Sequence, residues 1–380
     1  MIYMNQAATT YPKPQCVLEV HTASLHTMPE GQFRSDLCTT GESILEQCRK
    51  NIGKLLGISE YDRIYFSCGA TDSSNAVIYG LPLAGKHVVT TQTEHNSILR
   101  PLMNLKDRVG SVTIVPCNEY GKVDIEKLEE SVTKETAAIF VNHCSNVTGM
   151  VQDLKKIGKI AEEKGVLFVV DASQSAGCIP IDVDAWNIDV LIFTGHKSLF
   201  GAQGTGGYYV RGGGEFRPYR YGGTGRNSSQ LTYENGDYEY ETGTQNSTGI
   251  SALNAGVKYI LERGVETIAE KERVMMKRIY EELGAIKNVK VYGTYEENYG
   301  PVVSFNISGM NPSDVAYILQ NCYDIIVRTG LQCAPLIHEA LGTEEKGTVR
   351  VSISDMTSEN EVESLLAALK EITASVEVQM

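Results

Sequence analysis

The sequence has no long hydrophobic run and no excess of positive charge. Its 380 residues contain no apolar stretch of about 18 residues, and the start, MIYMNQAATT, shows no basic region followed by an apolar core. We therefore expect neither a membrane span nor a classical secretion signal. The formal net charge of −13 argues against a surface that binds nucleic acid. Membrane proteins and nucleic-acid-binding proteins are thus disfavoured.

Closely spaced cysteine pairs are also absent. The nine cysteines are an odd number, and no two of them have the CxxC spacing of a zinc ribbon or a thioredoxin-type redox pair. Scattered, unpaired cysteines are typical of a reducing cytosol, so we expect a cytoplasmic protein in which most of them are small core residues. They stand at positions 16, 38, 48, 68, 117, 144, 178, 322 and 333.

Strand-like and helix-like segments alternate over the first half of the chain. The strand-like runs are RIYFS, HVVTT, SVTIV, AAIFVN, VLFVV and DVLIF, with helix-like segments near 71–82, 95–106, 124–131 and 153–164. This alternation predicts an α/β fold with a mostly parallel sheet that is covered on both faces. Ligand sites in such folds lie at the carboxyl ends of the strands.

The second half of the chain has a different pattern. A tyrosine- and glycine-rich stretch at 212–249 precedes a long helical region at roughly 250–284. The short strands VKVYG, VVSFNIS, DIIVRTG and TVRVSIS then alternate with helices near 312–321 and 359–372, which predicts a smaller α+β domain. We expect a large domain of residues 15–250, and a small domain of residues 251–380 together with the turn-rich arm 1–14.

Lys197 is the first candidate for chemistry. The apolar run IDVLIF predicts a buried strand that ends at Thr194-Gly195, and His196-Lys197-Ser198 follows before a glycine-rich return. A lysine at the end of a buried strand becomes a nucleophile when its pKa is lowered, and its usual product is a Schiff base. An exposed loop lysine is the common alternative.

Asp171 ends the preceding buried strand, GVLFVVD, and Gln174 lies just beyond it. Pyridoxal phosphate needs a lysine for its aldehyde and, in many enzymes, a carboxylate that keeps its ring nitrogen protonated. Adjacent strands ending in Asp171 and near Lys197 would place both groups at one edge of a sheet. Capping of a following helix is the alternative role of Asp171.

Three further segments contain polar residues after predicted strands. In Phe66–Thr71, a turn before a helix could hold a phosphate with Ala70 and Thr71, although Thr71 could instead cap the helix. No GxxxxGK[ST] loop is present, and Thr194 and His196 could also reach a phosphate. His95 could stack on a cofactor ring, and Asn146 could bond to it; a structural histidine and a turn asparagine are the alternatives.

Near the C-terminus, VRTGLQCAP places Cys333 in a loop after a predicted strand, and Arg350 lies on the strand TVRVSIS. A loop cysteine beside cationic groups can ionise and act as a nucleophile. An arginine held on a strand suits a bidentate grip on a substrate carboxylate. A core thiol and a surface salt bridge are the alternatives.

Taken in order, these motifs resemble one family. NQAATT, GAT, TEH, SNVTG, DASQ, FTGHKSLFG, GGTG, ETGTQN, RTGLQCAP and VRVSIS are similar to the motifs of class V aminotransferase-fold pyridoxal phosphate enzymes, over residues 4 to about 365. The similarity is greatest to the cysteine desulfurase and selenocysteine lyase branch. TGHK with an upstream DxxQ and TEH points to the fold, and RTGxxCAP points to removal of sulfur from cysteine.

The resemblance implies a role for each matching residue that would hold the cofactor. Lys197 would bind pyridoxal 5'-phosphate covalently and later move the α-proton of the substrate. Asp171 would pair with the pyridine nitrogen, Gln174 with the phenolic oxygen, and His95 would stack on the ring. The phosphate would be bound by Ala70, Thr71, Thr194 and His196, and the segment Gly243-Thr244 would come from the other subunit of a homodimer.

The resemblance also implies how the substrate is bound. Arg350 would bind its carboxylate, with Asn146 assisting and Ala7 nearby, and Cys333 would attack its sulfur. The products would be alanine and a persulfide, which would pass to a sulfur-acceptor protein. The chain departs from the family pattern at three places: Asn5-Gln6, Gln332 and Asp355-Met356-Thr357.

The function that we predict is therefore that of a cytoplasmic, homodimeric, pyridoxal-phosphate-dependent cysteine desulfurase acting on L-cysteine. One alternative is a selenocysteine lyase that acts on L-selenocysteine with the same residues. A second is another class V lyase or aminotransferase, in which Cys333 is incidental. A third is a non-catalytic partner in sulfur or cluster assembly, which the joint presence of Lys197, Asp171, His95 and Arg350 disfavours.

Overall fold

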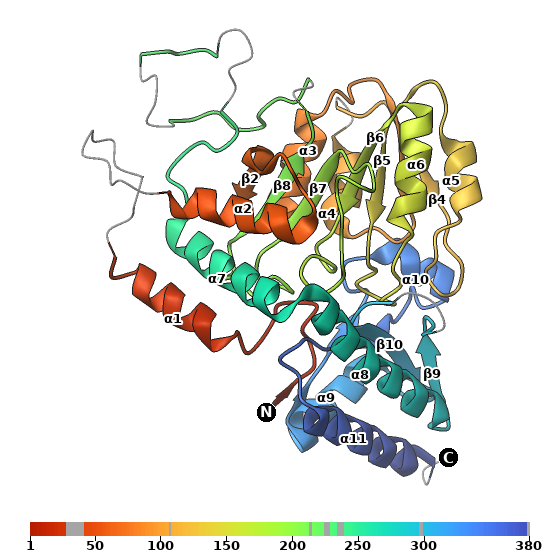
Figure 1. The fold of residues 1–380 in the computed structure, drawn as a ribbon. Helices are drawn as coiled ribbons and strands as arrows, with labels where there is room; N and C mark the ends of the chain where they lie inside the picture. The colour runs from red at the N-terminus through yellow and green to blue at the C-terminus, as the bar shows by residue number, and fades with distance from the viewer. Residues whose placement is uncertain are drawn as a thin grey trace.

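A seven-stranded sheet forms the centre of the larger lobe. The computed structural model describes residues 1–27, 42–105, 108–212, 215–223, 229–233, 239–295 and 299–377. The strand order is β2-β8-β7-β6-β5-β3-β4; β8 pairs antiparallel with β2 and β7, and the other neighbouring strands pair in parallel (Figure 1). The strands are β2 (Ile64–Ser67), β3 (His87–Thr91), β4 (Ser111–Val115), β5 (Thr136–Asn142), β6 (Leu167–Asp171), β7 (Val190–Thr194) and β8 (Gly206–Val210).

Helices cover both faces of this sheet because its central strands are apolar on both sides. Val169 packs in one core with α3 (Ala70–Gly80) and α4 (Asn96–Asn104). Val170 points to the opposite core, as alternation along a strand requires. That second core contains residues of α2 (Ile44–Leu56), α5 (Ile125–Ser131), α6 (Leu154–Lys164) and α7 (Ser247–Arg263). The predicted α/β class with a mostly parallel sheet is confirmed.

Local signals set the ends of these helices. At α2, the hydroxyl of Ser43 accepts a hydrogen bond from the Glu46 amide at 3.2 Å, and Gly57 ends the helix with φ of 66°. At α6, Asp153 caps the first turn and Gly165 ends the last with φ of 65°. Serine and aspartate at N-caps and glycine in the left-handed conformation after the last turn are the expected residues. In the sequence, apolar residues between Glu42 and Gly57 fall on one helical face and predict a helix that ends at this glycine, which the structure confirms.

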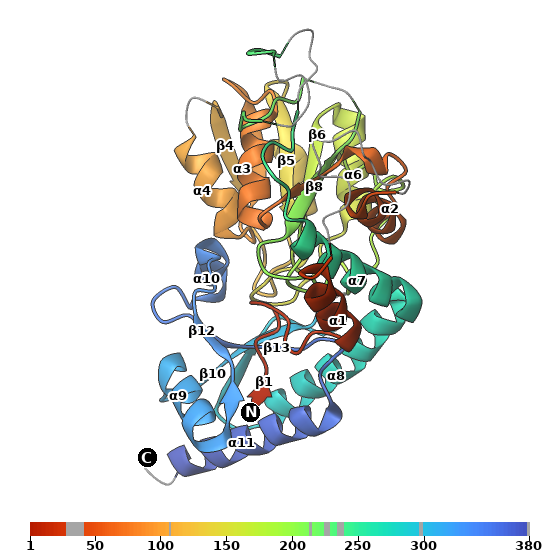
Figure 2. The same cartoon turned by 90° about the vertical axis from the view of Figure 1, so that its left-hand side faces the viewer.

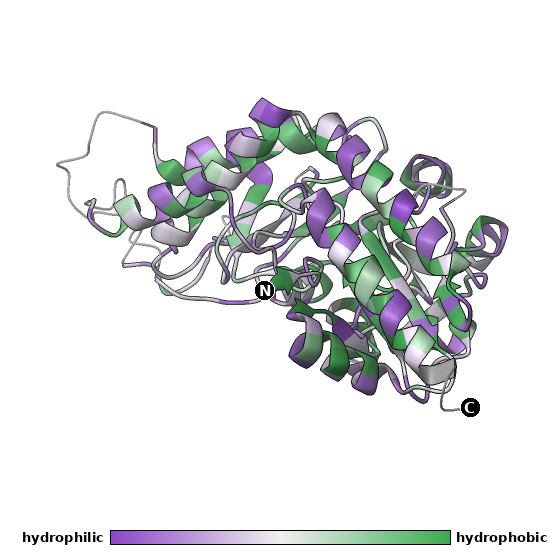
Figure 3. Cartoon of the chain, turned by 90° about the horizontal axis from the view of Figure 1, so that it is seen from below, coloured by the Kyte–Doolittle hydropathy of each residue, from purple (hydrophilic) through white to green (hydrophobic). Residues whose placement is uncertain are grey.

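The smaller lobe is built on an antiparallel sheet of order β12-β13-β10-β9 (Figure 2). Its strands are β9 (Val289–Tyr292), β10 (Val302–Ile307), β12 (Arg328–Gly330) and β13 (Thr348–Ser352). The helices α8 (Val265–Ala285), α9 (Pro312–Tyr323) and α11 (Glu359–Glu377) supply apolar residues to the core around this sheet, and α10 (Pro335–Leu341) faces the larger lobe. Seen from below, the helices carry both hydrophobic and hydrophilic positions, as amphipathic surface helices do (Figure 3).

The structure modifies two sequence expectations, one about the long helical region and one about the N-terminal arm. The helix predicted at 250–284 is two helices, α7 and α8, because the chain turns at Gly264 with φ of 83°. The N-terminal arm contributes more than a turn: β1 (Ile2–Tyr3) pairs with β11 (Ile325–Ile326), and Met4 is fully buried in the small-lobe core.

The remaining helix, α1 (Gln15–Ser24), packs against α7. The buried side chains of α7 belong to the core of the large sheet, so that core continues past residue 250. Over the described part of the chain, no helix has the length and hydrophobicity needed to cross a membrane.

Candidate active site

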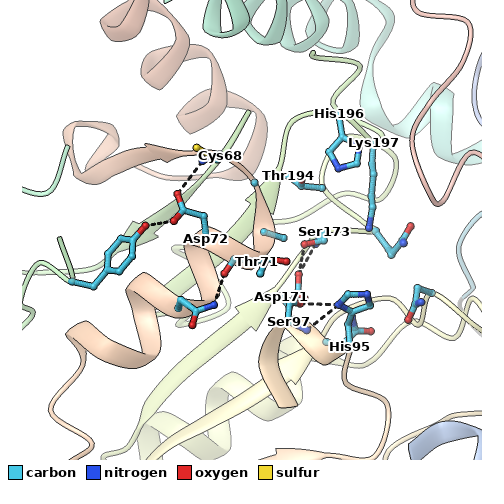
Figure 4. A pocket seen from close by; sticks show the side chains of 17 residues that line it. Cys68, Thr71, Asp72, His95, Ser97, Asp171, Ser173, Thr194, His196 and Lys197 are labelled. Atoms are coloured by element: carbon cyan, nitrogen blue, oxygen red, sulfur yellow. Dashed lines mark hydrogen bonds between the residues drawn. The ribbon is translucent and has the colours of Figure 1, made fainter. Parts of the chain in front are cut away.

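A cavity of about 670 Å³ lies at the carboxyl ends of the large-sheet strands. Figure 4 shows that His196 and Lys197 enter it from one side, whereas Asp171, Ser173 and His95 surround the same space. Strands β6 and β7 pair in parallel, so the segments that follow them reach the same edge of the sheet. The predicted residues that line the cavity are Ala70, Thr71, His95, Asn146, Asp171, Gln174, Thr194, His196 and Lys197.

Lys197 follows β7 within three residues, in a turn closed by the Phe200 amide donating to the Lys197 carbonyl at 2.8 Å. Burial lowers the pKa of its amine to about 8, and the negative charge of Asp171 opposes this effect. At physiological pH, a lysine with this pKa has a much larger neutral fraction than an ordinary lysine, and the neutral amine is the form that attacks a carbonyl group. The alternative of an exposed loop lysine is therefore wrong.

Asp171 is the last residue of β6 and is almost fully buried. Its Oδ1 accepts hydrogen bonds from the amide and hydroxyl of Ser173, which fix its orientation toward the cavity. The residues after Asp171 form turns, so it does not cap a helix. A buried, oriented carboxylate beside the cavity can hold a proton on a ligand ring nitrogen.

The N-terminus of α3 forms the anion-binding corner of the cavity. Helix α3 begins at Ala70 with Gly69 as its N-cap, so the alternative that Thr71 caps this helix is wrong. A Cβ on Gly69 would lie 3.6 Å from the Thr194 hydroxyl, which shows how close the helix start is to β7. Among the residues described, Thr194 Oγ1 and His196 Nδ1 are buried with no hydrogen-bond partner. Free helix amides and two unpartnered polar groups together favour a phosphate.

His95 is the N-cap of α4. Its Nδ1 accepts a hydrogen bond from the Ser97 amide at 3.0 Å and lies 2.9 Å from the Ser97 hydroxyl. Burial lowers the pKa of the ring to about 4, and the positive charge of Lys197 acts in the same direction. His95 is thus a neutral ring lining the cavity, in a fixed orientation.

Arg350 lies next to the cavity on β13 and is 3% exposed. Its Nη1 donates to the Asn146 carbonyl at 3.1 Å, and its Nη2 donates to Asn5 Oδ1 at 2.9 Å. Its Nε has no hydrogen-bond partner in the described part of the chain. Burial lowers the pKa of the guanidinium to about 10, with the charge of Arg328 adding to the effect. A buried cation whose described partners are neutral is a strong binding group for a carboxylate.

Cys333 lies outside the cavity lining, at its edge, and its side chain is exposed. The Asn96 amide, next to His95, donates to the Cys333 carbonyl at 2.7 Å. The charge of a Cys333 thiolate contributes to the pKa of both Lys197 and Arg350. The fold therefore brings this small-lobe loop to the large-lobe site.

Two other predicted residues also lie outside the lining. Ala7 is buried, and its carbonyl accepts a hydrogen bond from Gln174 Nε2 at 3.0 Å. Thr244 is exposed in the single chain and does not face this chain's own cavity. Of the GGTG motif at 222–225, the last two residues lie outside the described ranges.

Sequence reasoning missed several lining residues, including Asn142, Ser173 and Tyr219. Tyr219 comes from the tyrosine-rich stretch and donates a hydrogen bond to Asp72 on α3. Asn142 ends β5, and this position at the carboxyl end of a predicted strand could have indicated that it lines the cavity. Ser173 lies within the quoted DASQ motif. In the described ranges, no group of three or more His, Cys, Asp or Glu residues is arranged to hold a metal ion.

Two of the departures from the family pattern, at Asn5 and at Asp355, contact charged side chains. Asn5 contacts Arg350, as described above. Asp355 forms ion pairs with Arg263 at 2.5 Å and Lys271 at 3.4 Å, and it accepts a hydrogen bond from the Tyr259 hydroxyl at 2.6 Å. Asp355 thus ties the end of the arginine strand to α7 and α8.

Comparison with known proteins identifies the family. Residues 2–365 match the family model for aminotransferase class-V, so the chain belongs to this family. It is 33% identical to a probable cysteine desulfurase of Methanothermobacter thermautotrophicus, over 98% of this chain and 94% of that protein. It is 32% identical to a probable cysteine desulfurase of Pyrococcus abyssi, over 99% of this chain and 95% of that protein.

A solved structure agrees with these sequence relatives. The apo structure of a cysteine desulfurase from Thermococcus onnurineus NA1 superposes with a TM-score of 0.88 at 31% sequence identity. The match covers 98% of this chain and 95% of that one. The resemblance expected from the sequence motifs is thereby confirmed.

Proposed function

We propose that this protein is a pyridoxal-phosphate-dependent cysteine desulfurase that converts L-cysteine to L-alanine. The observation that carries the proposal is the attachment of the Cys333 loop beside His95, at the edge of the cavity that contains Lys197. The relatives named cysteine desulfurase support the same reaction.

The residues of the cavity fit pyridoxal 5'-phosphate. The start of α3, Thr194 and His196 offer unsatisfied donors for a phosphate, and Lys197 offers an amine for the aldehyde. Asp171 can hold a proton on the ring nitrogen, and His95 can lie against the ring. When bound, this cofactor withdraws electrons from the α-carbon of an amino acid.

The protein residues then have separate tasks. Arg350 binds the carboxylate of L-cysteine, with Asn146 assisting from the cavity lining and Ala7 nearby. The amine of Lys197 takes the proton from the α-carbon and returns it, which a pKa of about 8 allows near neutral pH. The buried, neutral His95 keeps its place through Ser97 while these protons move.

Cys333 accepts the sulfur. Its thiolate attacks the sulfur of the substrate, the substrate's C–S bond breaks, and an S–S bond forms on the enzyme. A proton replaces the sulfur on the substrate carbon, so L-cysteine and the thiol become L-alanine and a persulfide. The exposure of Cys333 allows an acceptor protein to remove the persulfide sulfur.

We further propose a homodimer that works in the cytoplasm. Thr244 is exposed in the single chain, which agrees with a role in the partner's site. The eight cysteines that the structure describes carry free thiols, as expected in a reducing compartment.

The test compares wild type, Lys197→Ala and Cys333→Ala with L-cysteine and with L-selenocysteine. With a thiol reductant present to release the persulfide sulfur as sulfide, we expect wild type to produce alanine and sulfide from L-cysteine, and neither variant to do so. Cys333→Ala should still bind the cofactor and turn yellow, whereas Lys197→Ala should not hold it covalently. Full L-cysteine turnover by Cys333→Ala, or turnover of L-selenocysteine alone, would replace the desulfurase proposal with that of a selenocysteine lyase or another lyase.

A further inference from the structure

The turn that carries Cys333 has an unusual backbone. The Ala334 amide donates to the Leu331 carbonyl at 2.9 Å, and the two central residues, Gln332 and Cys333, have φ of 42° and 60°. Positive φ at both central positions is the pattern of a type I′ turn, in which glycine, asparagine and aspartate are the usual residues. Glutamine and cysteine adopt it at a steric cost, so the contacts around the turn must hold it.

The side chain of Gln332 makes such contacts. It is buried, and its Nε2 donates to the Thr348 carbonyl on β13 at 3.0 Å. Its Oε1 accepts from the Thr348 hydroxyl at 3.3 Å and lies 3.0 Å from Nε2 of His338 on α10. His338 is itself fully buried, with Nδ1 2.7 Å from the Thr343 hydroxyl. Gln332 is therefore bonded to both α10 and β13, the two elements that follow the turn in the chain.

These bonds place a hydrogen on Nε2 of His338. Since Gln332 uses its amide nitrogen toward a carbonyl, its oxygen faces His338, and His338 Nε2 must donate. The other ring nitrogen, Nδ1, faces the Thr343 hydroxyl, which donates to it when the ring is neutral. Burial lowers the pKa of His338 to about 4, which keeps it neutral at physiological pH.

The carbonyls of the same turn are bonded to the larger lobe. Asn146 Nδ2 donates to the Gln332 carbonyl at 2.7 Å, and the Asn96 amide donates to the Cys333 carbonyl at 2.7 Å. Asn146 lines the cavity, and Asn96 follows His95. A change in the backbone of this turn would therefore move the thiol relative to the cavity.

We propose that Gln332 and His338 are positioning residues for Cys333. Their hydrogen-bonded pair holds the left-handed turn that presents the thiol at the mouth of the cavity. Neither side chain is among the residues that line the cavity in the described structure, so both act through Cys333. The catalytic part of this proposal rests on the proposed role of Cys333, whereas the structural part concerns the turn alone.

Paired variants separate backbone strain from loss of a side chain. Gln332→Ala and Gln332→Gly lose the same hydrogen bonds, but glycine adopts positive φ without steric cost. His338→Ala loses the bond to Gln332, whereas His338→Gln can still donate it. We expect kcat for L-cysteine to fall at least ~10-fold in both alanine variants with KM within about 2-fold of wild type. The glycine and glutamine variants should keep more activity than their alanine counterparts.

Hydrogen exchange of the holoenzyme supplies a readout that does not depend on activity. The Ala334 amide should exchange at least ~10-fold faster in the two alanine variants than in wild type, because the turn opens more often. Peptides from α6, remote from the turn, should exchange at the wild-type rate and so report an intact fold.

Two results would overturn the proposal. One is equal kcat in Gln332→Ala and Gln332→Gly, whether high or low. The other is wild-type exchange at Ala334 in His338→Ala. If Cys333→Ala retains full turnover, the proposed function fails instead, while the exchange rates still decide whether this pair holds the turn.

Discussion

At the scale of single residues, the site depends on two cations with lowered pKa values. Burial lowers the pKa of Lys197 to about 8 and that of Arg350 to about 10. The first effect makes a neutral amine available near physiological pH. The second still leaves the guanidinium charged at that pH, and its described hydrogen-bond partners, Asn5 and Asn146, are neutral. In the proposed reaction, these states suit Lys197 for proton transfer and Arg350 for anion binding.

The pKa of Lys197 predicts how cofactor capture depends on pH. In protein stripped of cofactor, the rate of covalent capture of added pyridoxal 5'-phosphate should rise with pH and level off above about pH 8, because only the neutral amine reacts. The measurement is the rate at which the yellow chromophore appears between about pH 6 and pH 10. In Asp171→Asn the midpoint should move to lower pH, since the Asp171 charge raises the Lys197 pKa. A rate that still rises beyond about pH 10, as for an ordinary lysine, would contradict this.

Arg350 predicts a change in KM. Arg350→Lys keeps a positive charge but loses the paired donors, so KM for L-cysteine should rise about 10- to 100-fold while cofactor content stays at the wild-type level. Arg328→Gln is the matched control, because Arg328 is exposed and affects the site only through its charge. Its KM should remain within about 2-fold of wild type. An unchanged KM in Arg350→Lys would remove Arg350 from substrate binding.

At the scale of elements, a buried carboxyl joins two strand ends beneath the site. Glu94, between β3 and α4, accepts hydrogen bonds from the Thr91 hydroxyl at 2.8 Å and from the Asn142 amide at 2.7 Å. Its Oε2 has no partner among the described residues. Burial raises the pKa of Glu94 to about 8, with the charge of Asp171 adding to the effect. The carboxyl is therefore protonated in the folded protein at pH values where the unfolded chain ionises it.

This difference predicts the sign of a stability change. The folded state binds more protons than the unfolded state between about pH 4.5 and pH 8, so this group lowers the free energy of unfolding as pH rises through that window. Glu94→Gln should remove the effect and stabilise the cofactor-free protein on the order of 4 kcal/mol at pH 8, with little change at about pH 4.5. Urea unfolding at both pH values measures the free energy of unfolding of the variant and of wild type. The exposed Glu163→Gln is the control, and equal stabilities of Glu94→Gln and wild type at pH 8 would contradict the assignment.

At the scale of the whole molecule, the two lobes are joined around the cavity. Val147 of the larger lobe packs in one small core with Tyr292, Ala334, Ile337 and Leu341 of the smaller lobe. A Cβ on Gly149 would lie 2.3 Å from the Val302 carbonyl, so the backbones of the two lobes touch there. Figure 2 shows α10 between the lobes. The Cys333 loop is consequently held by contacts to both lobes.

The proposed dimer predicts complementation between two defective subunits. If Thr244 serves the partner's site, a mixed dimer of Lys197→Ala and Thr244→Trp contains one site with both native residues. Random mixing makes half of the dimers mixed, each with one of two sites restored, so about a quarter of wild-type activity should return. Mixing Lys197→Ala with Lys197→Arg should restore none. Failure of the first mixture, with dimers present by light scattering, would place both residues in one chain's site.

The alternation of strands and helices, and hence the parallel sheet and its ligand-binding edge, can be predicted from the amino-acid sequence alone. Apolar runs of strand length ending in Asp171 and shortly before Lys197 were enough, because the carboxyl ends of neighbouring parallel strands must meet. Cap residues such as Gly57 also located helix ends locally. The break within the long helical region was missed, since the sequence around a single Gly264 does not show that its φ is positive.

Which distant segments meet can be seen only in the folded chain. Residues separated by nearly the whole chain, such as Asn5 and Arg350, bond to each other, and no local pattern encodes such pairings. The same holds for Gln332, His338 and Thr348, whose bonds depend on how α10 and β13 pack around a turn with positive φ. Local propensity specifies elements, whereas burial and hydrogen bonding between lobes specify where the reactive side chains point.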